Sequence, residues 1–400
     1  MSRLALVSLI SALIGGAAVL LVGRAAGWVG PAGRTTVVRA AVVPDASAPV
    51  IADAARPLTG NGFDPAQIYR ARVAGVVTIV SSFGDPASPA ASVGQGSGFA
   101  VSAHGFVLTS AHVITTAGTG SGSARARAVY VEFQDGDRVP ATIVGADLYD
   151  DIGVLRVDPH LHAVVPLPLG DSSRLVVGQP VAAIGSPFGN ADSLSVGVVS
   201  AVRRAIPSLT TRYDLIDAIQ TDAPINHGNS GGPLLDARGR VIGINAQIRS
   251  SGTSSGFEGV GFAVPVDSAR RTLDDLLQHG KVEYAYLGIT AATLTPGAAV
   301  AAGYRVHTGA VVETVVPGSP AAAAGFHAGT GTKVVAGLEV QLGADVVVAI
   351  DGRAVTTSED LVRAVSERLV PDQVARFTVV RGGKRLTIPV RLGRRAGGNG

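Results

Sequence analysis

The chain contains no cysteine, so a disulfide framework, a thiol nucleophile and a cysteine-ligated zinc site are all excluded. Charge is also scarce: 16% of the residues are charged, with 33 basic against 30 acidic groups and a formal net charge of +3. So small an excess, spread along the chain, argues against a nucleic-acid partner. By contrast, 46% of the residues are hydrophobic, which is ample for buried cores, and a length of 400 residues predicts two or three domains.

An uncharged run stands near the amino terminus, at residues 4–23, "LALVSLISALIGGAAVLLVG". As a helix it would measure about 30 Å, enough to cross a bilayer, and it exceeds the apolar region of roughly 7 to 15 residues in a cleaved signal peptide. We therefore predict an uncleaved transmembrane anchor over residues 1–24, in preference to a buried core helix. Residues 25–62 are rich in alanine and proline and are expected to form a linker.

The direction in which this anchor inserts stays open from the residues alone. One arginine precedes the span and three follow it, namely Arg3, then Arg24, Arg34 and Arg39. By the positive-inside rule this balance argues weakly against an external position for the C-terminal part.

From residue 63 to residue 264 the pattern is one of short β-branched runs punctuated by glycine, such as "VVTIVSSF", "GFVLTSA" and "VGFAVPV". Many short strands with almost no helical period between them predict antiparallel barrels or sandwiches. A doubly wound sheet is disfavoured, because it would need helices between the strands.

One helix is predicted at 267–279, "DSARRTLDDLLQH", where it would end a domain of residues 63–280. Asp267 or Ser268 is the expected cap, and Gly280 is placed to end the helix. The expected apolar stripe consists of Leu273, Leu276 and Leu277.

Residues 284–393 mix strands with one clear helix, "SEDLVRAVSERL", for which Ser358 is the expected cap. They are predicted to form a separate α+β domain, with residues 394–400 as a frayed tail.

A glycine-rich turn, "GNSGG", surrounds Ser230. Taken alone, such a turn is more often only a turn. A serine nucleophile needs a base and a third group to orient that base. "GFVLTSAHVI" ends a strand at His112, and "YDDIGVLRVD" places Asp151 at the start of another. The order His, Asp, Ser on an all-β framework is that of chymotrypsin-like proteases.

The backbone N–H groups of Gly228 and Ser230 are then expected to form an oxyanion hole. His227 is not expected to be the base, because it precedes Gly228 within the same turn. We expect its side chain to face the substrate cleft at the entrance of the specificity pocket, where its charge would tune binding. A solvated turn histidine is an equally good interpretation.

Five long stretches of the sequence are informative together: "GSGFAVSAHGFVLTSAHVI", "YDDIGVLRVD", "VAAIGSPFGNADSLSVGVVSAVRR", "IQTDAPINHGNSGGPLLDARGRVIGIN" and "GFEGVGFAVPVDSARRTLDDLL". They closely resemble the HtrA (DegP/DegS-like) serine proteases. The resemblance implies a mainly β chain: a chymotrypsin-like double β-barrel protease domain followed by one α+β PDZ domain, with an N-terminal transmembrane helix. It also implies a homotrimer, and a bacterial membrane protein whose protease and PDZ domains are extracytoplasmic.

The same resemblance implies the catalytic roles: His112 as base, Asp151 as its partner and Ser230 as nucleophile. Asp150 is an adjacent rival, but the family pattern at "DIGV" selects Asp151. No cofactor is needed, since this chemistry uses only side chains, N–H groups and water. No metal site is expected either; the "HLH" at 160–162 is more typical of a surface loop.

In the second domain "YLGI", comprising Tyr286, Leu287, Gly288 and Ile289, matches the carboxylate-binding loop of PDZ domains, which bind a C-terminal peptide as an added strand. An ordinary strand start is the alternative. The insertion at 327–343 departs from the compact PDZ pattern and leaves the peptide preference open.

Substrate preference is predicted from Pro224, which stands six residues before Ser230, at the base of the specificity pocket in related enzymes. Without a carboxylate there, we expect cleavage of unfolded or damaged proteins after small or medium apolar residues. The alternative function is a membrane-tethered peptide-binding or chaperone protein in which cleavage is secondary.

Overall fold

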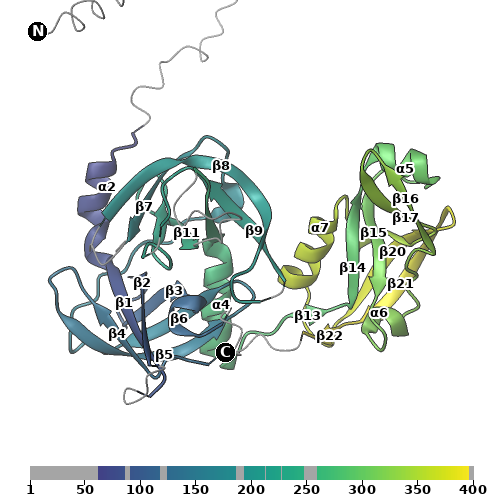
Figure 1. The fold of residues 1–400 in the computed structure, drawn as a ribbon. Helices are drawn as coiled ribbons and strands as arrows, with labels where there is room; N and C mark the ends of the chain where they lie inside the picture. Colours follow the sequence, from purple (N-terminus) through teal and green to yellow (C-terminus); the bar gives the residue numbers. More distant parts are fainter. Residues whose placement is uncertain are drawn as a thin grey trace, which may run out of the picture. The chain divides into compact units, whose positions relative to one another are not determined.

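The computed structural model describes residues 62–85, 91–117, 124–185, 193–211, 213–226, 228–246 and 259–395 (Figure 1). The predicted anchor and nearly all of the predicted linker lie outside these residues. Within the described ranges, no helix has the length and apolar character that a bilayer-spanning helix needs.

The first domain begins with a short helix and a closed antiparallel barrel. Helix α2 (Pro65–Arg72) starts where the Asp64 carboxylate accepts the N–H of Gln67, and it runs into the 3₁₀ turn η1 (Val73–Gly75). The barrel has the strand order β1-β2-β3-β6-β5-β4. Its strands are β1 (Val76–Phe83), β2 (Ser92–Ala100), β3 (Phe106–Ser110), β4 (Ala128–Glu132), β5 (Arg138–Asp147) and β6 (Ile152–Val157), with the helical turn α3 (Ala111–Ile114) after β3.

A second closed barrel of order β10-β11-β12-β9-β8-β7 follows the 3₁₀ turn η2 (Ser172–Arg174). Its strands are β7 (Pro180–Gly185), β8 (Ser193–Pro207), β9 (Asp214–Thr221), β10 (Pro233–Leu235), β11 (Val241–Ala246) and β12 (Gly261–Pro265). The two barrels confirm the antiparallel architecture predicted from the short glycine-punctuated runs.

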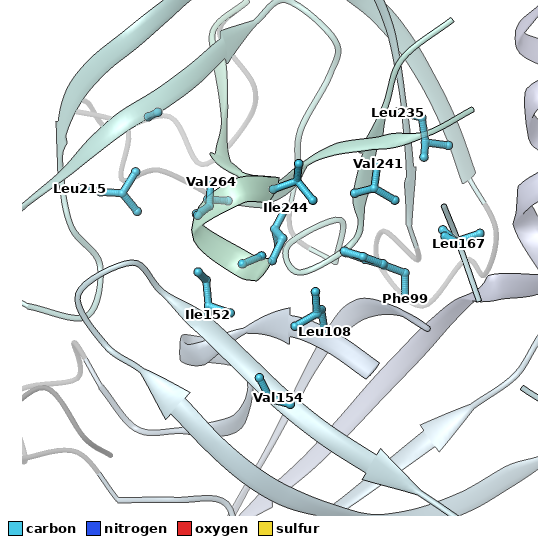
Figure 2. Packing of buried hydrophobic residues seen from close by; sticks show 14 of the residues in the cluster. Phe99, Leu108, Ile152, Val154, Leu167, Leu215, Leu235, Val241, Ile244 and Val264 are labelled. Carbon is cyan, nitrogen blue, oxygen red and sulfur yellow. The ribbon is translucent and has the colours of Figure 1, made fainter. Parts of the chain in front are cut away.

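Besides a hydrophobic cluster inside each barrel, the two barrels share a third cluster of buried residues. Figure 2 shows Phe99 and Leu108 of the first barrel close to Ile244 and Val264 of the second, and all four side chains are buried. Burying a side chain of this size stabilises the fold by roughly 2 kcal/mol. The shared core therefore fixes the position of one barrel against the other, which matters because each barrel supplies candidate site residues.

Helix α4 (Val266–His279) ends the first domain, and Gly280 ends the helix with a left-handed φ of 69°, as predicted. The predicted cap is wrong: the helix begins directly after β12 with Pro265 at the cap position and no side-chain cap. The Asp267 carboxylate instead accepts hydrogen bonds from Ser172 and Ser173 at the start of η2.

The apolar stripe predicted for α4 is wrong at Leu277, which is 48% exposed. The buried positions of the helix are Val266, Ser268, Ala269, Thr272 and Leu276. Because an α-helix turns about 100° per residue, a face centred on Ala269, Thr272 and Leu276 directs Leu277 toward solvent.

The second domain is an antiparallel sheet with three short helices. The sheet order is β14-β15-β18-β20-β21, with β19 paired to β18. The strands are β14 (Ile289–Leu294), β15 (Gly309–Val315), β18 (Val346–Ile350), β19 (Arg353–Ala354), β20 (Val374–Arg381) and β21 (Lys384–Arg391). The helices are α5 (Pro296–Ala302), α6 (Pro320–Ala323) and α7 (Ser358–Arg363), and α7 continues as the π-helical segment η4 (Ala364–Arg368).

The cap of α7 lies one residue before the predicted one. Thr357 and Asp360 form a reciprocal capping box, so Ser358 is the first helical residue.

The insertion at 327–343 contains a hairpin of β16 (Gly331–Val335) and β17 (Leu338–Leu342), whose Val335 and Val340 pack with Ala299 of α5. The insertion therefore adds to the core of the second domain.

The end of the described chain returns to the segment where the second domain starts. Strand β13 (Ala285–Tyr286) pairs with β22 (Gly393–Arg394), so Arg394, predicted to start a frayed tail, lies in a strand. The Arg395 guanidinium lies 4.9 Å from the ring centroids of Tyr149 and Tyr213 and 5.8 Å from that of Tyr284. This arginine therefore contacts the turn between β5 and β6 of the first barrel.

Candidate active site

His112 and Asp151 come together because β3 and β6 are antiparallel neighbours. Their register pairs Ser110 with Ile152, so each of the two residues lies just beyond the end of its strand. His112 Nδ1 is 2.7 Å from Asp151 Oδ2, and the His112 N–H donates to Asp151 Oδ1 at 2.9 Å. The carbonyl of Asp151 also accepts the N–H of Ala111 at 3.1 Å. Three hydrogen bonds therefore hold Asp151 against His112 and its neighbour Ala111.

The charge of Asp151 controls the basicity of His112. Burial by itself would lower the pKa of His112, but the Asp151 carboxylate and its hydrogen bond outweigh burial, so the pKa is raised. Since Nδ1 faces a carboxylate, the proton of the neutral ring belongs on Nδ1, and Nε2 remains an acceptor. That is the tautomer a general base toward a serine hydroxyl requires.

Asp150, the sequence rival of Asp151, faces a different partner. Its Oδ2 accepts a hydrogen bond from Arg271 Nη2 of α4 at 3.0 Å. The structure thus places Asp151 at the histidine and Asp150 at an arginine.

Ser230 lies in the turn between β9 and β10, and its backbone packs on the first barrel. The Ser97 N–H of β2 donates to the carbonyl of Ser230 at 2.8 Å. Gly231 has a φ of 84°, and a Cβ atom there would lie 2.2 Å from the Ser97 carbonyl oxygen and 2.9 Å from the Ser110 nitrogen. Only glycine permits this approach, and it brings the turn against Ser110, two residues before His112.

The Ser230 hydroxyl is buried and has no hydrogen-bond partner among the described residues. The structure therefore joins His112 to Asp151 and brings the serine turn next to them, without a hydrogen bond between histidine and serine. Catalytic hydrogen bonds of this kind are often long in unliganded enzymes and tighten with substrate.

The two expected oxyanion-hole donors flank Asn229. Gly228 has a φ of 97°. Within the described part of the chain, no hydrogen bond engages the N–H of Gly228 or of Ser230. Both N–H groups are thus free to bind an anionic oxygen.

Ser97, which the sequence reasoning missed, supports this turn from behind. Its hydroxyl donates to the carbonyl of Gly228 at 2.5 Å, and its own carbonyl accepts the Thr109 hydroxyl at 2.6 Å. This bond directs the Gly228 carbonyl toward Ser97. Ser97 lies within the stretch "GSGF", but its role depends on a contact between the two barrels that no local pattern contains.

Pro224, the residue predicted for the base of the specificity pocket, is exposed, and its carbonyl accepts hydrogen bonds from Asn229 Nδ2 and Ser195 Oγ. The adjacent carboxylate of Asp222 accepts the Val198 N–H at 2.6 Å. It is therefore engaged by the backbone of β8. The prediction for His227 lies outside the described residues.

No cluster of three or more potential metal ligands occurs in the part of the chain that the structure describes. In the "HLH" segment, the ring of His162 stacks on Phe133 at 3.7 Å, and its Nε2 lies 3.1 Å from Asp135. His160 is exposed.

The "YLGI" segment lies where the sheet of the second domain begins. Gly288 has a φ of 84°, and its carbonyl accepts the Val316 N–H, while the carbonyl of Leu287 accepts the Ala321 N–H. The side chain of Leu287 is buried in the domain core. Strand β14, which starts at Ile289, is an edge of the sheet and lies near α7 (Figure 1). The geometry suits addition of a peptide strand.

Comparison with known proteins agrees with this architecture. A trypsin-like peptidase domain model matches residues 96–244, and a PDZ domain model matches residues 285–392. The serine protease PepD of Mycobacterium tuberculosis is 34% identical over 97% of this chain and 76% of its own length. A probable periplasmic serine endoprotease, DegP-like, of Halomonas elongata is 37% identical over 74% of this chain, which spans only 56% of that relative.

A solved structure titled "HtrA-type protease AlgW with tripeptide" superposes with a TM-score of 0.68 and 31% identity, over 84% of this chain and 98% of that one. The sequence relatives, the two domain matches and the double barrel with its PDZ region agree. The chain belongs to the HtrA family of serine proteases.

Proposed function

We propose that this protein is a serine endopeptidase that cleaves unfolded or damaged proteins with His112, Asp151 and Ser230. The observation that carries the proposal is the pairing of His112 with Asp151 beside the glycine turn of Ser230. The chain's membership of a family of serine proteases supports the same reaction.

In this mechanism His112 Nε2 accepts the proton of the Ser230 hydroxyl as its oxygen attacks the substrate carbonyl. Asp151 stabilises the imidazolium, and the N–H groups of Gly228 and Ser230 bind the developing oxyanion. His112 then protonates the leaving amine, and water hydrolyses the acyl-enzyme by the same route.

For the substrate we propose small or medium apolar residues at the cleaved position. Pro224 supplies no negative charge, and the carboxylate of Asp222 is bound to the β8 backbone. We also propose that the PDZ region binds C-terminal peptides along β14, with the N–H groups around Leu287, Gly288 and Ile289 receiving the carboxylate. The solved structures of AlgW with a tripeptide and a decapeptide support peptide binding here.

For location and assembly we propose a homotrimer anchored in a bacterial membrane by residues 4–23, with both domains extracytoplasmic. The anchor rests on the uncharged run in the sequence, and the location on the relative named periplasmic.

The test uses an unfolded model protein and three forms of the chain: wild type, Ser230→Ala and the control Ser366→Ala, whose serine lies in η4. We expect cleavage by wild type and control but none by Ser230→Ala, with mapped cuts after residues such as Val, Ala and Leu. A fluorophosphonate probe should label Ser230 in the same two proteins. Equal cleavage by all three would contradict the protease mechanism, and cuts mainly after Arg or Lys would contradict the pocket.

A further inference from the structure

We propose that Asp147 is a positioning residue for catalysis, which holds the turn from which Asp151 faces His112. The inference rests on the proposed peptidase function. Asp147 is the last residue of β5, and the turn of residues 148–151 joins β5 to β6.

The turn needs external support because Asp151 adopts a strained backbone. Its φ is 53°, in the left-handed region that disfavours residues with a Cβ atom. The contacts of Asp151 with Ala111 and His112 are made from this conformation. A turn that relaxed to an ordinary φ would carry the carboxylate away from the histidine.

Asp147 supplies support from inside the turn. Its side chain is completely buried, and Oδ1 accepts the N–H of Tyr149 at 3.0 Å and that of Asp150 at 3.3 Å. These are two of the three residues that separate Asp147 from Asp151. The carboxylate thereby fixes the backbone that leads directly into the strained residue.

The other oxygen of Asp147 ties the turn to more distant parts of the chain. Its Oδ2 accepts the Thr272 hydroxyl of α4 at 3.0 Å and the Tyr284 hydroxyl, from the segment before the PDZ region, at 2.5 Å. Both oxygens thus hold two donors each, and the buried carboxylate is fully satisfied. Through its two oxygens the carboxylate therefore links the turn to α4 and to the segment before the PDZ region.

The charged groups around this carboxylate are few. Asp150 of the same turn pairs with Arg271 of α4, which also lies within the electrostatic reach of Asp147. Arg395, the last of the described residues, lies over the rings of Tyr149 and Tyr284. Among the described residues, His112 itself has Asp151 as its charged partner.

A matched control exists in the other barrel. Asp236 is buried in the turn between β10 and β11, where its carboxylate accepts the N–H groups of Arg238 and Arg240 and the Arg240 side chain. It is also a buried aspartate that organises a turn between two strands. Its turn, however, carries no residue of the candidate site.

The experiment compares Asp147→Ala, Asp147→Asn and Asp236→Ala in the full chain, through kcat, KM and the pH profile of kcat. For Asp147→Ala we expect kcat to fall about 10- to 100-fold at similar KM, because Asp151 is displaced. The acid limb of the profile should move to lower pH, because His112 loses the charge that raises its pKa. Asp147→Asn keeps an oxygen for the two N–H groups and should recover most of kcat.

Asp236→Ala should lower the melting temperature and leave kcat and the acid limb unchanged. An Asp147→Ala protein that behaved in the same way would overturn the inference, as would an Asp147→Asn protein as slow as Asp147→Ala. If Asp147→Ala does not fold, the variants Tyr284→Phe and Thr272→Val replace it, because each removes one hydrogen-bond donor to Asp147 Oδ2. An unchanged kcat and an unchanged acid limb of the pH profile in both variants would then overturn the inference. Equal cleavage by wild type and Ser230→Ala would instead remove the proposed function itself.

Discussion

At the scale of single residues, the candidate site depends on side chains that do not take part in the reaction. Ser97 binds the carbonyl of Gly228, and Asp147 binds two N–H groups of the turn before Asp151. Both side chains are buried. Breaking either set of hydrogen bonds would leave buried polar groups without a partner, which costs free energy, so these contacts are maintained. The positions of Ser230 and Asp151 are therefore determined by neighbours from other strands.

For Ser97→Ala we expect kcat to fall about tenfold or more at similar KM, because the Gly228 carbonyl is released and the oxyanion-hole backbone gains freedom. The measurement is cleavage of a chromogenic peptide with an apolar residue before the scissile bond. Ser81→Ala is the control, since Ser81 is a buried serine of β1 whose hydroxyl has no partner among the described residues. Equal kcat values in the two variants would contradict the role of Ser97.

At the scale of elements, local signals predict that a helix exists but place its start less well. Gly280 ends α4 as expected, because an αL residue after a helix has a steric requirement that glycine alone meets cheaply. The starts of α4 and α7 differ from prediction because several adjacent residues could cap each helix. At α4 the carboxylate of Asp267 accepts hydrogen bonds from Ser172 of η2 and does not cap its own helix. At α7 the side chain of Thr357, and not that of Ser358, accepts the N–H of Asp360.

We expect Thr357→Ala to lower the free energy of unfolding of the PDZ region by about 1 kcal/mol, since it removes a helix cap. Ser358→Ala keeps the capping box of Thr357 and Asp360 and should cost less, although it removes the hydrogen bond to Thr293. Thermal and urea unfolding followed by circular dichroism measure both. A larger loss in Ser358→Ala would show that the cap lies where the sequence placed it.

At the scale of the whole molecule, the protease barrels and the PDZ region meet through partly buried charged groups and through aromatic rings. Arg363 of α7 forms an ion pair with Asp217 of β9 at 2.6 Å, and Tyr284 and Arg395 contact the first barrel from the two ends of the PDZ region. Burial and the neighbouring Asp150 raise the pKa of Asp147 to about 7, and burial and Asp217 raise the pKa of Glu367 to about 7.

These raised pKa values predict a stability that falls as the pH rises. Each carboxyl binds its proton more tightly in the folded protein than in the unfolded chain, so its stabilising effect is fully present below the unfolded value of about 4. The effect is lost as the pH rises through about 7, because the buried groups must then ionise.

We therefore expect urea unfolding at about pH 5.5 to show a larger free energy of unfolding than at about pH 8, with a smaller difference in Asp147→Asn. Asp236→Asn serves as the control and should keep the wild-type difference. Identical pH dependence in wild type and Asp147→Asn would contradict the raised pKa of Asp147.

The sequence by itself determined the parts of this protein that follow from local chemistry. Short β-branched runs between glycines indicate antiparallel strands, and a serine within "GNSGG" after a histidine and an aspartate indicates acyl-transfer chemistry. The double barrel, the PDZ region and the family all agree with those predictions.

Only the tertiary structure decided which groups support the candidate site. The register of β3 and β6 places Asp151 at His112, while Asp150 turns to Arg271. Ser97 binds the carbonyl of Gly228, which is 131 positions away in the sequence. Asp147 binds the N–H of Tyr149 in the adjacent turn, and its carboxylate also accepts hydrogen bonds from Thr272 of α4 and from Tyr284. A hydrogen bond depends on distance in space and on burial, and chain folding sets both, so these roles have no signature in the order of the residues.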